Sequence, residues 1–194
     1  MSELNRYENN VFEGPARLAM YGKDAMQEWR TYDYYRMECE LPEVGLYTYH
    51  SLSIAKQWHT SYFKYLYNRV GAKYEWFYGN FQTDHDLQRY LNTFYRHYVT
   101  LMLGGKPIGF AILTKVDKEC NLSYFGIFPE YTGFGLGRKM LLECMQYATD
   151  IGCDKMWLYT TSNDHPGALS LYRKVGFSVV EKKTVSEYFP VRDE

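Results

Sequence analysis

The stretch Ile127-Phe128-Pro129-Glu130-Tyr131-Thr132-Gly133-Phe134-Gly135-Leu136-Gly137-Arg138-Lys139-Met140-Leu141 carries the strongest structural signal in this chain. Its beginning is typical of a strand, and three glycines at alternate positions predict a sharp turn that leads into an amphipathic helix. Glycines carry no side chain to hold a ligand away, and the first turn of a helix directs unpaired N–H groups and a partial positive charge toward that turn. The sequence therefore predicts a backbone site for an anion such as a phosphate or a diphosphate.

Length and charge limit what kind of protein this is. With 194 residues the chain is large enough for one domain with its own core, and its formal net charge is only −1. This balance does not favour nucleic acid or an anionic membrane as a partner, and no apolar run approaches the length of a spanning helix. The N-terminus does not resemble a signal peptide, and we expect a cytoplasmic location. We expect no metal site, since no histidine pair has ligand spacing, and we expect reduced thiols at the four cysteines, which form no CxxC pair: Cys39, Cys120, Cys144 and Cys153.

Hydrophobic periodicity predicts the elements on either side of the glycine turn. Residues 1–42 show only weak strand or helix patterns. The elements expected after them are a short strand at 46–50, a helix over 54–70 capped by Ser51 or Ser53, a second helix over 86–94 capped by Asp84, and a β-hairpin over 97–103 and 107–115 that turns at Gly104-Gly105. Beyond the hairpin we expect a strand at 121–128, a helix over 136–151, a strand at 155–160, a helix over 167–174 and a strand at 177–183.

This order of elements predicts a mixed α/β sheet and separates the folds that bind anions at a glycine turn. The P-loop pattern GxxxxGK[ST] is absent, and Gly104-Gly105-Lys106-Pro107 is a hairpin turn by its context. The dinucleotide pattern GxGxxG is not met either, because the glycines run GxGxG. Both nucleotide interpretations are therefore weakened.

The residues resemble a known family at this point. The run 127–141 is similar to the acyl-CoA-binding motif of the GNAT superfamily of N-acyltransferases, in which a strand leads into an [Arg/Gln]-Gly-x-Gly-x-Gly/Ala turn and a helix. A second signature of that family, an alanine followed by a Leu-Tyr-x-Lys-x-Gly-Phe run, is matched by residues 168–177, Ala-Leu-Ser-Leu-Tyr-Arg-Lys-Val-Gly-Phe. The resemblance implies an α/β GNAT fold, a mixed and mostly antiparallel sheet flanked by helices. It implies a domain over 45–184, with 1–44 as an N-terminal extension packed on it and 185–194 as a C-terminal tail.

The same resemblance implies a cosubstrate, acetyl-CoA, and the residues that hold it. The backbone from Gly133 to Arg138 would bind the diphosphate, and the strand before the turn would diverge from its neighbour to receive the pantetheine arm and the thioester carbonyl. Gly126 supports this independently, because a glycine inside a strand often marks a close backbone approach. The cofactor-binding residues expected by resemblance are Phe125, Gly126, Ile127, Phe128, Gly133, Phe134, Gly135, Leu136, Gly137, Arg138 and His165. A plain tight turn at the glycines and a solvated cation at Arg138 are the structural alternatives.

Tyr172 matches the general acid of the family. A tyrosine stays protonated at neutral pH and can give a proton to the departing CoA thiolate; its alternative role is a core aromatic beside Leu171 and Phe177. The general base is not assigned, since Asn121 stands where a glutamate is expected. Glu119, Glu130 and Asp164 are within reach along the sequence. His165 could act as a base, although Asp164-His165-Pro166 also fits helix capping, with Asp164 as the cap.

The sequence leaves the acceptor open. An N-acetyltransferase of a small-molecule, peptide or protein amine is the first hypothesis, with a homodimer as a possible assembly by resemblance. A CoA-binding or regulatory module with little catalysis is the alternative, motivated by Asn121 and Thr132, and a hydrolase built on Asp164 and His165 lacks a paired nucleophile. The acceptor surface expected from residues 51–95 is rich in aromatic side chains, which serve either cation–π contact or packing.

Overall fold

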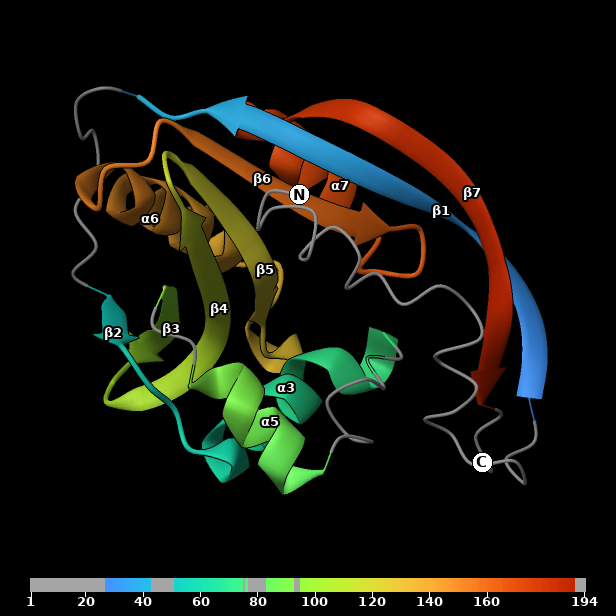
Figure 1. Ribbon diagram of the computed structural model, residues 1–194, viewed down its shortest axis with the longest axis horizontal. Coiled ribbons are helices and arrows are strands. Elements are labelled where there is room, and N and C mark those ends of the chain that lie inside the picture. Colours follow the sequence, from blue (N-terminus) through green and yellow to red (C-terminus); the bar gives the residue numbers. More distant parts are fainter. Residues whose placement is uncertain (1–26, 43–50, 75, 77–82, 93–94, 191–194) are drawn as a thin grey trace.

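The computed structural model describes residues 27–42, 51–74, 76, 83–92 and 95–190, and Figure 1 shows their arrangement. Within these residues the chain forms one seven-stranded sheet in the order β2-β3-β4-β5-β6-β1-β7. The strands are β1 (Gln27–Glu40), β2 (Leu52–Ala55), β3 (Arg96–Leu103), β4 (Lys106–Val116), β5 (Glu119–Ile127), β6 (Lys155–Thr161) and β7 (Ser178–Pro190). Neighbouring strands are antiparallel except β5 and β6, which are parallel, so the expected mixed, mostly antiparallel sheet is confirmed.

Helices cover both faces of this sheet. The described helices are α3 (Thr60–Gly71), α5 (Asp84–Leu91), α6 (Leu136–Asp150) and α7 (Ala168–Lys174), with short 3₁₀ turns η1 (Ala72–Tyr74) and η2 (Pro129–Tyr131). Figure 1 shows α3 and α5 on the opposite side of the sheet from α6. The architecture is therefore a sheet between two layers of helices, as the sequence predicts for an α/β chain.

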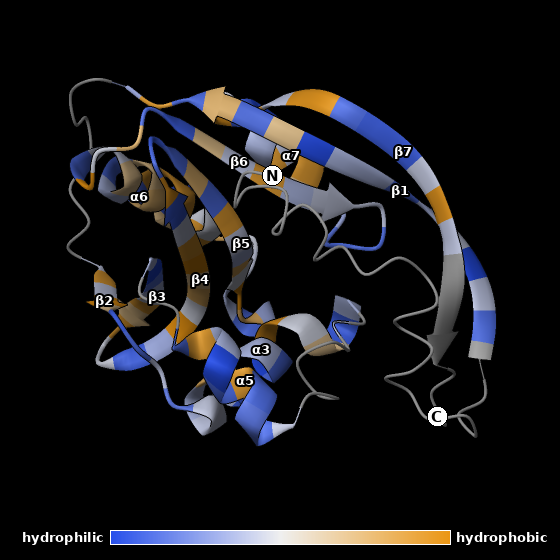
Figure 2. Ribbon diagram, in the orientation of Figure 1, coloured by the Kyte–Doolittle hydropathy of each residue, from blue (hydrophilic) through white to orange (hydrophobic). Residues whose placement is uncertain are grey.

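Two hydrophobic cores result from the two layers. The first lies under α6 and α7, and it includes Met140, Leu141 and Cys144 of α6 with Met156 and Leu158 of β6. The second lies under α3 and α5 and is largely aromatic: Trp58, Phe63, Leu66, Tyr67, Val70, Leu87, Leu91, Tyr98, Phe110, Ile112 and Phe128. Apolar residues along β4, β5 and α6 are visible in Figure 2. Much of the aromatic content of 51–95 therefore packs a core, the second of the two uses expected for it.

Strand β1 comes from the segment that the sequence did not place. It pairs with β6 from Glu40↔Lys155 to Tyr34↔Thr161 and with β7 from Gln27↔Pro190 to Glu38↔Ser178. Residues 27–40 thus extend the sheet at its β6 side. The expected division of the chain into an extension (1–44), a domain (45–184) and a tail (185–194) stays a prediction.

The expected hairpin, the strand after it, helix 136–151, strand 155–160 and helix 167–174 all appear within a residue or two of their expected bounds. The helix expected over 54–70 is wrong at its start. Residues 52–55 instead form β2, because Leu52 and Ile54 pack on the first core while the strand pairs with β3. Helix α3 begins at Thr60 after His59, whose side chain accepts the N–H of Ser61. The strand expected at 46–50 lies outside the described residues.

Two expected helix caps are also wrong. Thr83, and not Asp84, caps α5, since its hydroxyl accepts the N–H of Asp86 at 3.1 Å. The cap residue of α7 is Gly167, with no side-chain hydrogen bond, and the Asp164 carboxylate is bonded elsewhere. The last strand continues to Pro190 and is longer than the expected 177–183, because it follows β1 along its whole length.

Candidate functional site

The sheet divides between β5 and β6. These strands pair only from Glu119↔Lys155 to Leu122↔Leu158. Beyond that point β5 continues along β4 to Ile127, while β6 continues along β1 to Thr161, and Figure 1 shows the two strands separating. No strand among the described residues pairs with the β6-facing edge of residues 123–127. Because alternate residues of a strand direct their backbone groups to each edge, this edge offers N–H and C=O groups to a ligand.

The glycine turn leads from β5 into α6 and keeps its backbone open. Gly133 and Gly135 have φ angles of +85° and +75°, which side-chain-bearing residues rarely adopt, and no atom lies within 4 Å of the position that a β-carbon would take at either residue. Gly135 is the cap residue of α6 and makes no side-chain capping bond. The N–H groups of the first turn therefore keep their hydrogen-bonding capacity for an anion.

The other turn residues surround this backbone. Among the large hydrophobic side chains of the described residues, Phe134 is the most exposed, at 76%. Leu136 is half-buried, and a β-carbon on Gly137 would lie in ordinary contact, 3.7 Å from Ile127 and Leu171. Arg138 is exposed, and no ion pair joins it to another described residue. It is therefore a free cation in the first turn of α6, within the same turn as the open backbone.

The expected residues of β5 divide between the two faces of the sheet. Phe125 and Ile127 pack on the core under α6 and α7, and the Phe125 ring centroid is 6.2 Å from that of Tyr172. Gly126 faces α3 instead, where a β-carbon would lie 2.1 Å from Cγ1 of Val70. The glycine inside the strand does mark a close approach, as expected, but the group that approaches its α-carbon is a helix side chain.

Phe128 also lies on the α3 face. Its side chain is 1% exposed, and the guanidinium carbon of Arg69 lies 4.8 Å from its ring centroid. Its backbone N–H donates to the carbonyl oxygen of Ile108 at 2.8 Å. This N–H is thus already paired, and the carbonyl oxygen of Phe128 accepts the N–H of Tyr131 at 2.9 Å.

Tyr172 lies on α7 between two aromatic rings, those of Phe125 and Phe177, at 6.2 Å and 5.8 Å. Burial, with a further contribution from the Asp164 charge, raises the pKa of its hydroxyl above the usual value for tyrosine. Its hydroxyl makes no hydrogen bond to another described residue. The residue is thus both a packed aromatic and a protonated hydroxyl beside the separating strand.

Asp164 lies in the loop after β6. Its Oδ2 accepts the hydroxyl of Thr160 and the backbone N–H of Thr161, both at 2.8 Å, while Oδ1 lies 3.5 Å from the indole nitrogen of Trp76. His165 next to it is exposed, accepts the N–H of Gly167 at Nδ1 (2.9 Å), and its ring lies 5.8 Å from that of Tyr74. His165 is therefore engaged in its own turn and is not oriented by Asp164.

The other candidate carboxylates have different surroundings. Glu130, on η2, forms an ion pair with Arg69 of α3. Glu119, at the start of β5, lies 4.0 Å from Lys155. Asn121 joins the strands at the point where they separate, because its amide donates to the carbonyl oxygen of Trp157 at 3.3 Å and accepts the Ser123 hydroxyl at 2.5 Å. The sequence does not predict this link between the two strands, because it shows only that Asn121 stands where a glutamate is expected.

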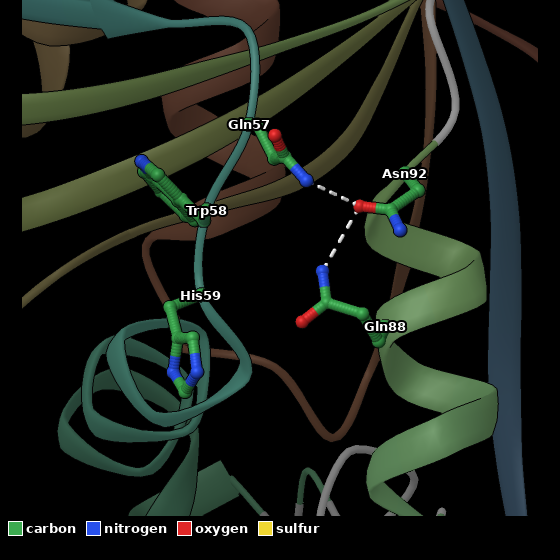
Figure 3. Close-up of a pocket in the computed structure, with 5 residues that line it drawn as sticks. All are labelled: Gln57, Trp58, His59, Gln88 and Asn92. Atoms are coloured by element: carbon green, nitrogen blue, oxygen red, sulfur yellow. Dashed lines mark hydrogen bonds between the residues drawn. The ribbon is translucent and has the colours of Figure 1, made fainter.

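A separate hollow lies between the start of α3 and α5 (Figure 3). Asn92 accepts the amide groups of Gln57 and Gln88 at 2.6 and 2.9 Å, and the other lining residues are Trp58 and His59. The three amide side chains hold one another, His59 caps α3, and neither the glycine turn nor the separating strands line the hollow.

No three His, Cys, Asp or Glu side chains of the described residues are grouped to hold a metal ion. None of the described helices is both long and apolar enough to cross a membrane. All four cysteines are free and buried.

The fold and the glycine turn define the class of acyl-CoA N-acyltransferase folds, and comparison with known proteins agrees. The Acetyltransferase (GNAT) family matches residues 52–177. The GCN5-related N-acetyltransferase structure from Sphaerobacter thermophilus superposes with a TM-score of 0.59 at 13% identity, covering 92% of this chain and 56% of that one. This chain belongs to the GNAT family.

Two curated relatives are similar in sequence. The [ribosomal protein bS18]-alanine N-acetyltransferase of Haemophilus influenzae is 30% identical over 115 residues, which are 59% of this chain and 71% of the relative. The N-alpha-acetyltransferase RimI of Mycobacterium tuberculosis is 33% identical over 90 residues, 44% of this chain and 54% of the relative. The chain thus spans about half the length of the mycobacterial relative.

Proposed function

We propose that this protein is an N-acetyltransferase that moves an acetyl group from acetyl-CoA to a primary amine by direct attack of the amine. The observation that carries the proposal is the separation of β5 from β6 after Leu122 and Leu158, directly before a glycine turn that opens an uncapped helix. An extended thioester fits along the free strand edge, and its diphosphate fits at the helix N-terminus. The family relatives named above act on amines, which supports the same reaction.

Acetyl-CoA supplies the acetyl group as a thioester. The backbone of residues 133–138 would hold its diphosphate, with Arg138 adding charge, and Phe134 offers an exposed ring beside the same turn. Residues 125–127 would orient the pantetheine arm and the carbonyl through the free edge of β5. The open glycine backbone and the unpaired strand edge support this fit, because both groups of donors lack a partner in the described protein. His165 stays a predicted contact of the cofactor.

Tyr172 would give a proton to the departing thiolate. The raised pKa of its hydroxyl keeps this proton in place at neutral pH, and its ring is held against Phe125 on the strand that would carry the thioester. Backbone N–H groups on the free edge would stabilise the developing charge on the carbonyl oxygen.

The acceptor in this proposal is an amine of a small molecule or of a peptide or protein. We also propose a cytoplasmic location and a homodimer, which fractionation and light scattering would test. No part of the proposal requires a metal, a nucleic acid or a membrane.

Calorimetric titration of the full chain with acetyl-CoA, with free CoA and NAD as comparisons, tests the site. We expect micromolar binding of both CoA ligands and none of NAD. A screen of amines that follows the released thiol then tests the reaction. Binding without acetyl transfer to any amine would favour the non-catalytic CoA-binding module, and absence of binding would overturn both proposals.

A further inference from the structure

We infer that Asp164 receives the acceptor as an ammonium ion and takes a proton from it, with Trp76 and Tyr74 forming the aromatic wall of that site. This inference rests on the proposed acetyl transfer and adds to it the residue that the sequence left unassigned and the charge state of the acceptor. The group that Asp164 would bind is a protonated primary amine, whether it belongs to an alkylamine or to a peptide N-terminus.

The first argument is the position of the Asp164 carboxylate. It lies in the loop directly after β6, the strand that separates from β5. Burial first, and then the charge of Asp164, raises the pKa of Tyr172 on α7 and of Tyr74 on η1. Tyr172 packs against Phe125 on the α6 face of the sheet, while Trp76 packs against Tyr124, with centroids 5.9 Å apart, on the α3 face. Asp164 therefore lies near the proposed acid on one face and the aromatic residues on the other.

The second argument is that this carboxylate is oriented but lacks a cation. The hydroxyl of Thr160 and the N–H of Thr161 fix Oδ2, and Oδ1 has only the long contact of 3.5 Å with Trp76. Asp33, Asp84, Asp86 and Asp154 each have a lysine or arginine partner. Among the described residues no such partner reaches Asp164, which is only partly exposed. A half-buried carboxylate without a counter-ion is a site for a cationic ligand.

The third argument is the aromatic surrounding. Trp76 and Tyr74 are partly exposed and contact Asp164 and His165 respectively, so that one wall of the site consists of ring faces and edges. Aromatic faces attract ammonium ions when these are partly desolvated. The acceptor thus enters from the α3 face, opposite the face on which α6 offers its N-terminus to the diphosphate.

The proton balance follows from these positions. An ammonium loses two protons as it becomes an amide. Asp164 takes the first and releases it to water, which frees the nitrogen lone pair to attack. The C–N bond forms and the C–S bond breaks with its electron pair going to sulfur. Tyr172 protonates the sulfur and regains a proton from the nitrogen, so that one proton in total is released.

The experiment measures kcat/KM with butylamine and with a short alanine-initiated peptide, for the full chain and for Asp164→Asn. We expect the variant to lose about 100-fold or more of kcat/KM with whichever acceptor is used. Its affinity for acetyl-CoA should stay within twofold, because the cofactor lies on the other face. Asp154→Asn, at the opposite end of β6 and exposed, is the matched control and should retain full activity. Sodium formate should partly restore activity to Asp164→Ala, which a purely structural role would not allow.

A second measurement needs no variant. Choline should inhibit the wild-type protein competitively against the amine, whereas its uncharged isostere dimethylbutanol should not, because only the cation pairs with Asp164. Wild-type activity retained by Asp164→Asn, or equal inhibition by both isosteres, would overturn the role of Asp164 and leave the acetyltransferase proposal in place. A wild-type protein that acetylates neither acceptor nor any other amine would overturn the proposed function and, with it, the role of Asp164.

Discussion

The α-carbon of Gly126 on β5 lies against Val70 on α3, so closely that a β-carbon at position 126 would lie 2.1 Å from Cγ1 of Val70. This contact brings the C-terminal end of α3 down onto the strand that separates from β6. The same helix end leads into η1, which carries Tyr74 and is followed by Trp76. A contact between a glycine and a valine thus helps to position the aromatic wall of the proposed acceptor site.

Gly126→Ala should therefore lower the free energy of unfolding by about 1–3 kcal/mol, because the added methyl group overpacks the contact. Val70→Ala alone should cost about 2 kcal/mol through the cavity that it leaves. The double variant should be more stable than the sum of the two costs predicts, since each change makes room for the other. Urea denaturation of the four proteins measures this coupling, and strictly additive costs would show that the two residues do not restrain each other.

Gly135→Ala should weaken binding of acetyl-CoA by tenfold or more, about 1.4 kcal/mol, because the methyl group enters the open backbone of the turn. Gly105→Ala is the matched control. Gly105 lies in the hairpin turn with a φ angle of +78°, close to the +75° of Gly135, and a β-carbon would have no neighbour within 4 Å at either position. The two variants should thus lose similar stability from backbone strain. Calorimetry should find the loss of affinity in Gly135→Ala alone, and equal affinities would contradict the proposed diphosphate site.

Local signals in the sequence predict much of this site. The alternate glycines and the apolar spacing after them give the turn and α6 nearly residue by residue, because caps and helices depend on residues within one or two turns. Tyr172 is placed on its helix for the same reason. The close approach at Gly126 is also visible, since a glycine inside a strand has few other causes.

Contacts between distant residues are what the sequence does not predict. Strand β1 pairs Met37 with Leu158 and Val179, more than a hundred residues away, and no local pattern indicates such pairing. The start of the helix expected at residue 54 was wrong because pairing with β3 overrides the helical spacing of 52–55. Asp164 fits a helix cap by position, but its carboxylate turns back to Thr160. Only the structure distinguishes the two directions.

Acid should destabilise the protein through His97, which is 6% exposed, with Nδ1 2.6 Å from the hydroxyl of Tyr147. Burial first, and then the charges of Lys56 and Lys115, lower the pKa of His97 to about 4, from 6.5 in its ordinary state. Below pH 6.5 the unfolded chain therefore binds a proton that the folded protein does not, and stability falls as the pH drops toward 4. We expect a loss of roughly 1–3 kcal/mol from this group.

The measurement is the free energy of unfolding at pH 7.5 and pH 4.5. His97→Gln should have a smaller difference between the two pH values than the wild-type protein. His85→Gln, at a residue whose side chain is 87% exposed, is the control and should have the wild-type difference. If His97→Gln had the wild-type difference as well, the acid sensitivity would have to come from other groups.

Tyr172→Phe should lower kcat by about 100-fold or more, because it removes the proton donor for the thiolate. The ring itself should stay in place between Phe125 and Phe177, since phenylalanine keeps both aromatic contacts. The affinity for acetyl-CoA and the midpoint of thermal unfolding should therefore change little. Tyr159→Phe, at a half-buried tyrosine on β6 that packs against Tyr34, is a control for the general loss of a hydroxyl and should retain activity. Equal losses of kcat and of cofactor affinity in Tyr172→Phe would mean that this tyrosine shapes the site and does not act as its acid.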